Sequence, residues 1–437
     1  MIQYTMFYYS TRNKNEKVNF KEAALTGLAP DGGLFVPEQI PQYSGTVRSS
    51  LGSMSFTDIA FETIKPFVQD DIPDAALHDI VRSAFTFDAP LIPITGSNIK
   101  DRFVVELFHG PTAAFKDFGA RFMARAFSYL RRGEDKPLKI LVATSGDTGG
   151  AVADGFFDID GISVTVLYPK GRVTPLQERQ IAGLGKNISA IAVEGSFDDC
   201  QRLVKAALAD EGLKKRMELS SANSINISRL IPQAVYYSAA AGRALAKTGK
   251  AITLCVPSGN FGNLTAGLYS MKMGAPIEQF VAATNMNKTI PDYLDTGEYL
   301  TRISQATISN AMDVGAPSNF ERMSAHFSYE EMKKIITGVY VTDEETRKTI
   351  VLVHNDTGYF LDPHSAVGWK GVDKLLEANR ISHPVGILCT AHPAKFSETV
   401  EPLVGMPPIP ESLAGAMKRT VKADTIPAEV DALISLL

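Results

Sequence analysis

The sequence predicts an α/β protein in which parallel sheets are covered by helices on both faces. After Leu138, short continuous runs of Val, Ile and Leu alternate with amphipathic segments. Such continuous apolar runs are typical of strands that are buried on both faces. Glycine-rich loops also follow two of these runs directly. Open α/β sheets bind their ligands at the carboxyl ends of the strands, so these loops are the first candidates for a site.

The composition is ordinary for a globular protein and argues against several classes of partner. Of 437 residues, 45% are hydrophobic and 21% are charged, and 44 basic against 48 acidic residues give a net charge of −4. This balance gives no reason to expect nucleic acid or a membrane as a partner. The sequence has no transmembrane run and no recognisable signal peptide. We expect a cytoplasmic protein, and a monomer rather than a stable oligomer.

The cysteines and histidines predict neither a disulfide framework nor a metal site. Cys200, Cys255 and Cys389 are too few and too scattered, and we expect buried free thiols. The histidines are dispersed without the spacing of metal ligands. We therefore expect no metal.

The secondary structure follows from the same patterns. The first part of the chain predicts helices over residues 56–70 and 74–85, and residues 27–37 form a turn-rich connector. Strands are expected over residues 138–144, 162–169, 188–193, 251–256, 278–284 and 385–390. Helices are expected over residues 151–157, 174–185, 197–210, 228–247 and 264–274. Residues 296–323 fit neither pattern, and we interpret them as an excursion around the core.

One predicted helix has a clear start signal. Thr174 can cap it, Pro175 suits its first position, and Gln177 completes a capping box.

Lys116 is the first candidate for chemistry. It lies in "FHGPTAAFKDFGARF", between Phe115 and Phe118 with only Asp117 intervening. Burial among apolar groups lowers the pKa of a lysine, and a neutral amine attacks carbonyls, as a Schiff-base lysine must. The alternative is a structural lysine at the start of a helix, paired with Asp117.

The loop "VPSGNFGN", at residues 256–263, is a candidate anion site between a strand and a helix. Gly259 and Gly262 let the backbone approach a ligand closely, and the helix start presents N–H groups to an anion. Because no Gly-Lys-Ser/Thr follows, it is not a Walker loop. The alternative is a tight turn.

The loop "ATSGDTGGA", at residues 143–151, is the second candidate anion site. Thr144, Ser145 and Thr148 offer hydroxyl groups, so a carboxylate or phosphate could bind there. Asp147 argues against a dianion close to its own side chain.

A lysine in an apolar pocket beside two anion sites suggests one class of ligand. It is a carbonyl cofactor that carries a phosphate, together with a substrate that has its own carboxylate. Pyridoxal 5'-phosphate acting on an amino acid meets this description.

These segments together resemble the threonine synthase family, in the bacterial and fungal branch of the fold-type II pyridoxal-phosphate enzymes. "STRN" with "LTGLAPDGGLFVPE" is similar to the amino-terminal signature of that branch. The lysine segment and "PSGNFGN" are similar to the family's cofactor motifs, and "ATSGDTGGA" is similar to its substrate loop. The resemblance covers most of the chain.

The resemblance implies a cofactor between two α/β domains with parallel sheets, and an amino-terminal cap domain of helical and mixed structure. The implied boundaries are 1–92 for the cap, 93–125 with 230–437 for the large cofactor domain, and 126–229 for the small substrate domain. An excursion from the large domain is expected at about residues 290–340.

The resemblance also implies roles for individual residues. Lys116 would hold the cofactor as a Schiff base and move protons. The cofactor phosphate would be bound by Gly259, Asn260, Phe261, Gly262 and Asn263. Thr390 would face the pyridine nitrogen. Asp147 would also lie at the cofactor, although many relatives have Asn there, so an Asn-like hydrogen bond is not implied. The substrate carboxylate would be bound by Ser145 with Thr144 and Thr148, and the substrate phosphate by Ser224 and Arg229.

The implied reaction converts O-phospho-L-homoserine and water into L-threonine and phosphate. One alternative is a pyridoxal-phosphate-dependent phospho-lyase that releases a keto acid. Another is a binding protein that has kept the fold and lost catalysis.

Overall fold

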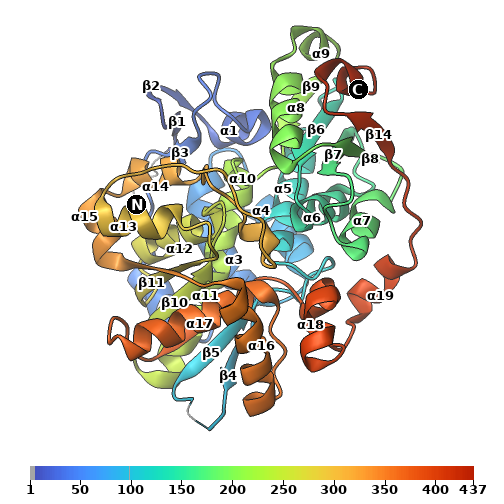
Figure 1. The fold of residues 1–437 in the computed structure, drawn as a ribbon. Helices are drawn as coiled ribbons and strands as arrows, with labels where there is room; N and C mark the ends of the chain where they lie inside the picture. Colours follow the sequence, from blue (N-terminus) through green and yellow to red (C-terminus); the bar gives the residue numbers. More distant parts are fainter. Residues whose placement is uncertain (1–4, 98) are drawn as a thin grey trace.

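The computed structural model describes residues 5–97 and 99–437, which build three sheets and the helices around them (Figure 1). The first sheet is antiparallel and has the strand order β2-β1-β3. Its strands are β1 (Tyr8–Ser10), β2 (Asn13–Val18) and β3 (Phe35–Pro37). The helices of this amino-terminal part are α1 (Phe20–Thr26), α2 (Gly45–Ser50), α3 (Phe56–Val68) and α4 (Asp74–Ala84). Helices α3 and α4 confirm the two helices predicted here.

The larger parallel sheet has six strands in the order β12-β11-β10-β13-β5-β4. All pairs are parallel except β4 with β5 at one edge. The strands are β4 (Leu91–Ile94), β5 (Arg102–Glu106), β10 (Ile252–Pro257), β11 (Ile277–Thr284), β12 (Ile336–Tyr340) and β13 (Val385–Cys389). Every residue of β10 and β13 is buried, as their continuous apolar runs predict.

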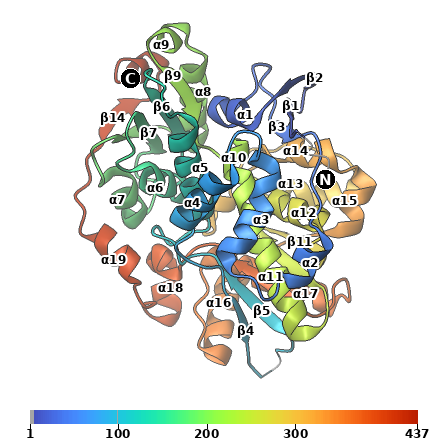
Figure 2. The same cartoon turned by 180° about the vertical axis from the view of Figure 1, so that it is seen from behind.

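Helices cover both faces of the larger sheet. On the near side in Figure 1 lie α16 (Asp343–Thr357) and α17 (Pro363–Glu377), and α17 packs on β10, β11 and β13. On the far side, which Figure 2 shows, α11 (Ala234–Thr248) packs against α3 and α12 (Gly262–Met273).

An excursion leaves the larger sheet between β11 and β12. Its elements are α13 (Thr289–Thr296), η2 (Asn310–Met312), α14 (Phe320–His326) and α15 (Tyr329–Ile335). Strand β12 then returns to the sheet beside β11.

The smaller parallel sheet has five strands in the order β14-β8-β7-β6-β9. They are β6 (Leu138–Ala143), β7 (Ile162–Pro169), β8 (Ile188–Glu194), β9 (Glu218–Ser221) and β14 (Asp424–Pro427). Its helices include α6 (Asp147–Phe156), α7 (Pro175–Ala182), α8 (Phe197–Ala209), α9 (Glu211–Arg216) and α20 (Val430–Ile434). The buried helix α5 (Lys116–Leu130) packs on α6 from this part and on α4 from the amino-terminal part.

The carboxyl-terminal segment corrects the predicted division of the chain. We placed residues 230–437 in the large domain, but β14 pairs with β8 of the smaller sheet. After α18 (Ser397–Val404) and α19 (Glu411–Met417) the chain runs along one side of the molecule to reach that sheet, as its red colour in Figure 1 shows. Strand β14 is short and mostly exposed, so its sequence carries no apolar run that would predict it.

Two predicted boundaries also fall inside elements. The boundary at 92/93 lies within β4, and the boundary at 125/126 lies within α5. Apart from these points, the division into a cap and two domains stays a prediction.

Two predicted helices differ in their limits. Residues 228–247 do not form one helix, because Pro232 has no N–H for the helical ladder. The segment contains α10 (Ile227–Leu230), the short 3-10 helix η1 (Ile231–Gln233) and then α11. Helix α6 starts at Asp147, inside the stretch predicted as a loop. The glycine at position 149 allows the helix to begin so close to the strand, because a Cβ on this residue would lie 2.5 Å from Thr144 Cγ2.

The capping box of α7 is confirmed. The Thr174 hydroxyl accepts a hydrogen bond from the N–H of Gln177, whose side chain accepts one from the N–H of Thr174. This box fixes the direction of the Gln177 side chain.

Candidate active site

A cleft of about 1430 Å³ lies where the carboxyl ends of β6, β10 and β13 meet. Both loops predicted to bind anions line it, as do Lys116 and Thr390. The structure therefore brings all the predicted site residues to one cleft, although their sequence positions span more than half of the chain. Their roles toward a ligand stay predictions.

Lys116 is the first residue of α5, and its side chain is 15% exposed, toward the cleft. Its Nζ lies 4.8 Å from the centroid of the Phe115 ring. Burial lowers the pKa of Lys116, and only the nearby Asp147 carboxylate opposes this effect. This is the environment that a nucleophilic lysine requires.

The proposed ion pair between Lys116 and Asp117 is wrong. Asp117 instead accepts hydrogen bonds from the Thr112 N–H at 2.9 Å and the Thr112 hydroxyl at 2.6 Å. The carboxylate facing Lys116 belongs to Asp147, whose Oδ2 lies 3.6 Å from Nζ. Adjacent residues on a helix point in different directions, so sequence proximity was misleading here.

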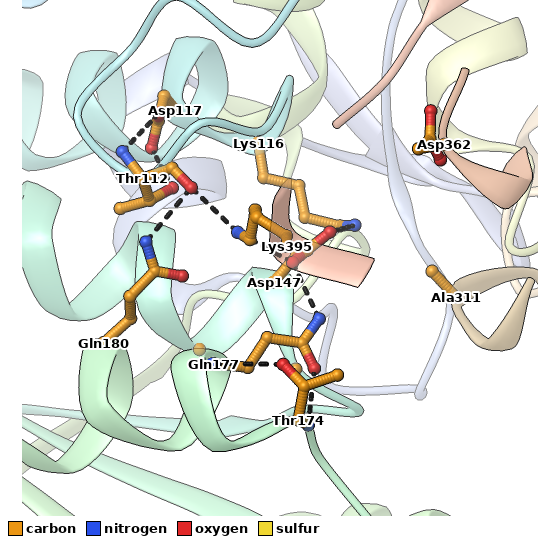
Figure 3. A network of polar contacts seen from close by, with 12 residues as sticks. Thr112, Lys116, Asp117, Asp147, Thr174, Gln177, Gln180, Ala311, Asp362 and Lys395 are labelled. Carbon is orange, nitrogen blue, oxygen red and sulfur yellow. Dashed lines mark hydrogen bonds and ion pairs between the residues drawn. The ribbon is translucent and has the colours of Figure 1, made fainter. Parts of the chain in front are cut away.

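A second lysine lies at the same carboxylate and was missed by the sequence reasoning (Figure 3). Lys395, in η3 (Pro393–Phe396), is buried and pairs with Asp147 Oδ1 at 2.8 Å. Gln177 donates to the same oxygen at 2.9 Å. Burial alone would raise the pKa of Asp147, but Lys395 and then Lys116 outweigh it and hold that pKa well below its ordinary value. The available signal was a lysine among apolar residues in "HPAKF", as for Lys116.

The loop before α12 presents polar groups to the cleft. Phe261 has a φ of +60°, a left-handed conformation that turns the chain sharply into the helix. The Asn263 carboxamide oxygen accepts the hydroxyls of Tyr236 and Tyr237, which fixes its orientation. Among the described residues, its buried Nδ2 then has no hydrogen-bond partner. The loop thus contains a helix amino terminus and an orphaned donor, which fit a phosphate group.

A neighbouring segment presses on this loop from outside. A Cβ on Gly259 would lie 2.7 Å from Ala311 O and from the Met312 Cα. His364 was expected only to lack metal spacing, but here its Nε2 accepts the Ala311 N–H at 3.2 Å. Its Nδ1 contacts Asp362 Oδ1 at 2.7 Å, so these two side chains hold η2 against the loop.

Ser224 and Asn260 connect the loop before α12 to the smaller sheet. The Asn260 Nδ2 donates to Ser224 Oγ at 2.6 Å, and both residues line the cleft. A ligand between the two sheets would therefore contact polar groups from both of them.

The loop between β6 and α6 offers hydroxyl groups on the other side. Ser145 and Thr148 line the cleft beside Gly146, whose φ of +140° is a glycine conformation. The Thr144 hydroxyl instead accepts the N–H groups of Gly146 and Gly149 at 2.9 and 2.8 Å. Thr144 thus shapes the loop, and this hydroxyl is committed to it.

Arg229 lies in the wall of the cleft and is buried. Its Nη1 donates to Ala222 O, while its Nε meets no partner in the part of the chain that the structure describes. Burial lowers the pKa of Arg229 to about 10, which leaves it cationic at neutral pH. A buried cation in the wall of a cleft favours an anionic ligand.

The end of β13 is tied to the lysine segment. The carbonyl of Thr390 accepts the Phe115 N–H at 2.9 Å, which fixes Thr390 beside Lys116 at the cleft.

The amino-terminal sheet borders the mouth of the cleft. Thr11 and Arg12 line it, and both side chains bond Glu321 of α14. The buried Arg322 donates to Phe35 O of β3, so the sheet and the excursion are held together.

The site fits the predicted cofactor. A lysine with a lowered pKa and an orphaned amide donor suit an aldehyde that carries a phosphate. Over residues 5–97 and 99–437, no group of three metal-binding side chains gathers. The three cysteines are buried and free, as expected. In the same ranges no helix is long and apolar enough to cross a membrane.

Family comparisons cover nearly the whole chain. Residues 7–85 match the family described as "Threonine synthase N terminus" and residues 86–391 match "Pyridoxal-phosphate dependent enzyme". Residues 365–436 match "Threonine synthase, C-terminal".

Individual relatives agree. The threonine synthase of Escherichia coli (strain K12) is 40% identical over 433 residues, which cover 99% of each chain. Its crystal structure superposes with a TM-score of 0.91 and covers 98% of this chain and 99% of that one. The structure of PLP-bound threonine synthase from Brucella melitensis is 36% identical with a TM-score of 0.89, and covers 99% of this chain and 98% of that one.

Proposed function

The chain belongs to the threonine synthase family of pyridoxal-phosphate-dependent enzymes, and we propose that it converts O-phospho-L-homoserine and water into L-threonine and inorganic phosphate. One observation carries the proposal. A half-buried lysine with a lowered pKa shares one cleft with polar groups suited to two anions, from the two parallel sheets. A phosphorylated amino acid with its own carboxylate matches this arrangement beside the cofactor.

Pyridoxal 5'-phosphate, when bound, withdraws electrons from the substrate and makes its Cα and Cβ protons acidic. Lys116 would hold the cofactor, and its amine would take and return the substrate protons. Gly259, Asn260, Phe261, Gly262 and Asn263 would bind the cofactor phosphate, with the orphaned Asn263 amide as one donor. Thr390 would face the pyridine nitrogen; a hydroxyl there does not enforce a protonated ring.

The substrate would be held at both ends. Ser145 and Thr148 would bind its carboxylate, with Thr144 shaping their loop. Arg229 and Ser224 would bind its phosphate, since Arg229 is a buried cation in the wall of the cleft. In the overall reaction the Cγ–O bond breaks and phosphate leaves with the bonding electrons. Cβ loses a proton and gains the hydroxyl group of water, Cγ gains a proton and becomes the methyl group, and the second proton of water goes to the phosphate.

The amino-terminal sheet would limit access of bulk water. The bonds of Thr11 and Arg12 to Glu321 support this role, because they close one side of the cleft mouth. Excluding water protects reactive intermediates from side reactions. We also propose a cytoplasmic monomer, and sedimentation equilibrium tests the second part of that statement.

Product analysis tests the proposed reaction. Purified holoenzyme incubated with O-phospho-L-homoserine should release threonine and phosphate in equal amounts. Lys116→Met should abolish both products, whereas Lys186→Met, at an exposed surface lysine, should keep them. Formation of 2-oxobutanoate in place of threonine would refute the synthase reaction and favour a phospho-lyase. No turnover by the loaded enzyme would favour a binding protein.

A further inference from the structure

Lys395 is a buried lysine that the proposed reaction does not use. It follows β13 in η3, and its side chain is 0% exposed. Its Nζ donates to the Thr112 carbonyl at 2.8 Å and pairs with Asp147 Oδ1 at 2.8 Å, as Figure 3 shows. Lys395 therefore joins the segment before α5 to the start of α6, directly beside Lys116.

The two oxygens of Asp147 have different surroundings. Oδ1 receives both Lys395 and the Gln177 amide, at 2.8 and 2.9 Å. Oδ2 faces Lys116 Nζ at 3.6 Å, which is longer than a hydrogen bond. The negative charge of Asp147 is thus compensated mainly by Lys395.

Charge balance decides which lysine carries a proton. Two ammonium groups beside one carboxylate would leave an uncompensated positive charge in a buried place, which is costly. Lys395 has the short contacts that stabilise an ammonium, and it is fully enclosed. Lys116 has only the long contact and faces the cleft. Lys116 is therefore the lysine that loses its proton.

We propose that Lys395 is a positioning residue, which compensates the charge of Asp147 and holds that carboxylate back from Lys116, so that the Lys116 amine is unprotonated and free to join the cofactor. This inference rests on the proposed role of Lys116. Without Lys395, Lys116 would be the only cationic partner of Asp147 among the described residues, and Asp147 would keep it protonated.

The other charged groups around Lys116 act consistently with this role. Burial is the largest influence on the pKa of Lys116 and lowers it; Asp147 raises it, and Lys395 and Arg229 lower it. Asp117 on α5 is engaged with Thr112. In the segment of Lys395, burial lowers the pKa of His392 to about 4, so this ring is neutral at pH 7. Lys395 and Arg229 thus remain as the cations that oppose Asp147.

Titration of Lys116 in the cofactor-free protein tests the proposal. Its amine is labelled with a small acylating reagent over a range of pH, and the Lys116 peptide is quantified by mass spectrometry. In Lys395→Met, the midpoint should rise by about one pH unit or more, because one pKa unit corresponds to a tenfold change in the protonation equilibrium. Covalent uptake of pyridoxal 5'-phosphate at neutral pH should slow about tenfold.

Lys374→Met is the matched control. Lys374 on α17 has the same kinds of partner, since its Nζ donates to the Tyr340 carbonyl at 3.0 Å and pairs with Glu345 at 2.7 Å. It does not line the cleft, so its removal should leave the Lys116 midpoint unchanged. Lys395→Arg keeps the charge and should return the midpoint toward the wild-type value.

Unchanged titration of Lys116 in folded Lys395→Met would overturn the proposal and leave Lys395 a structural residue. If that variant does not fold, Lys395→Gln, which keeps a hydrogen-bonding group without charge, gives the same decision. None of these measurements uses the substrate, so a failed product assay would not affect them.

Discussion

Lys116 and Lys395 show how surroundings assign different roles to identical side chains. Both lie near Asp147, but the buried Lys395 has a carboxylate and a carbonyl at hydrogen-bond distance, and the half-buried Lys116 has neither. An ammonium is stable in the first setting and costly in the second. The chemistry of the site therefore depends on differences of less than 1 Å in the contacts of one carboxylate.

Asp117 gives a pH-dependent prediction at this scale. Burial raises its pKa from the ordinary 3.8 to about 6. Folding thus favours the protonated form, and this stability is complete below about pH 4 and lost as the pH rises through about 6. Asp117→Asn stays neutral, and Asn can accept the Thr112 N–H and donate to its hydroxyl. From pH 4 to 7, the difference in free energy of unfolding should move in favour of the variant by up to about 3 kcal/mol.

Urea unfolding at fixed pH measures this difference. Asp295→Asn, at an exposed position, provides the baseline for the comparison. A difference between Asp117→Asn and wild type that does not change with pH would contradict the assignment.

At the scale of elements, the loop before α12 depends on the segment packed against it. Gly259 contacts η2 so closely that no side chain fits, and Asp362 with His364 anchors η2 through Ala311. The glycine is needed here for close approach. The helix start and the excursion from the larger sheet therefore form one unit.

Gly259→Ala should weaken cofactor binding about tenfold or more. The new Cβ would meet backbone atoms of Ala311 and Met312 at 2.7 Å, and overpacking of this kind costs about 1–3 kcal/mol. Titration of the cofactor-free protein with pyridoxal 5'-phosphate, followed by absorbance, measures the affinity.

Gly415→Ala is the control for this variant. Gly415 lies in α19, where an added Cβ meets nothing within 4 Å. It should leave cofactor affinity unchanged and increase stability by about 0.5–1 kcal/mol, because Ala favours helix. Equal affinity of the Gly259 variant and wild type would show that η2 does not constrain the loop.

At the scale of the whole molecule, the carboxyl-terminal segment connects the two parallel sheets. It leaves the larger sheet after β13, passes through Lys395 in η3, and ends beside β8 in the smaller sheet. There Leu433 is fully buried in an apolar cluster with Ile191 and Leu203. The end of the chain is therefore part of the core of the smaller sheet.

Leu433→Ala should lower the free energy of unfolding by about 2–5 kcal/mol, the usual effect of a cavity in a core. Leu436→Ala, at a residue that is 46% exposed, should change it by less than about 0.5 kcal/mol. Denaturant unfolding followed by circular dichroism compares the two. Equal effects would contradict the packing of this segment on the smaller sheet.

The sequence alone predicted those parts of the molecule that local patterns determine. The apolar run at β7 and the capping signal at Thr174 specify their elements without help from distant residues. The motifs around Lys116 and Gly259 were recognisable because each combines an unusual composition with a strand-to-helix position.

Features that depend on distant partners could not be predicted. Strand β14 forms by pairing with the edge of β8, and the residues of β14 themselves are mostly exposed. The pairing of Lys395 with Asp147 joins residues 248 positions apart, and no local pattern encodes it. The same reason explains why the alternative that paired Lys116 with Asp117 is wrong: it relied on a neighbour in sequence, whereas the partner is a neighbour in space.

Identification of the lysine that joins the cofactor tests the central claim most directly. Holoenzyme is reduced with borohydride, digested, and the peptides are analysed by mass spectrometry. The modified residue should be Lys116, with Lys395 unmodified. A cofactor adduct on Lys395 or on any other lysine, or no adduct in protein that has bound the cofactor, would contradict this description of the site.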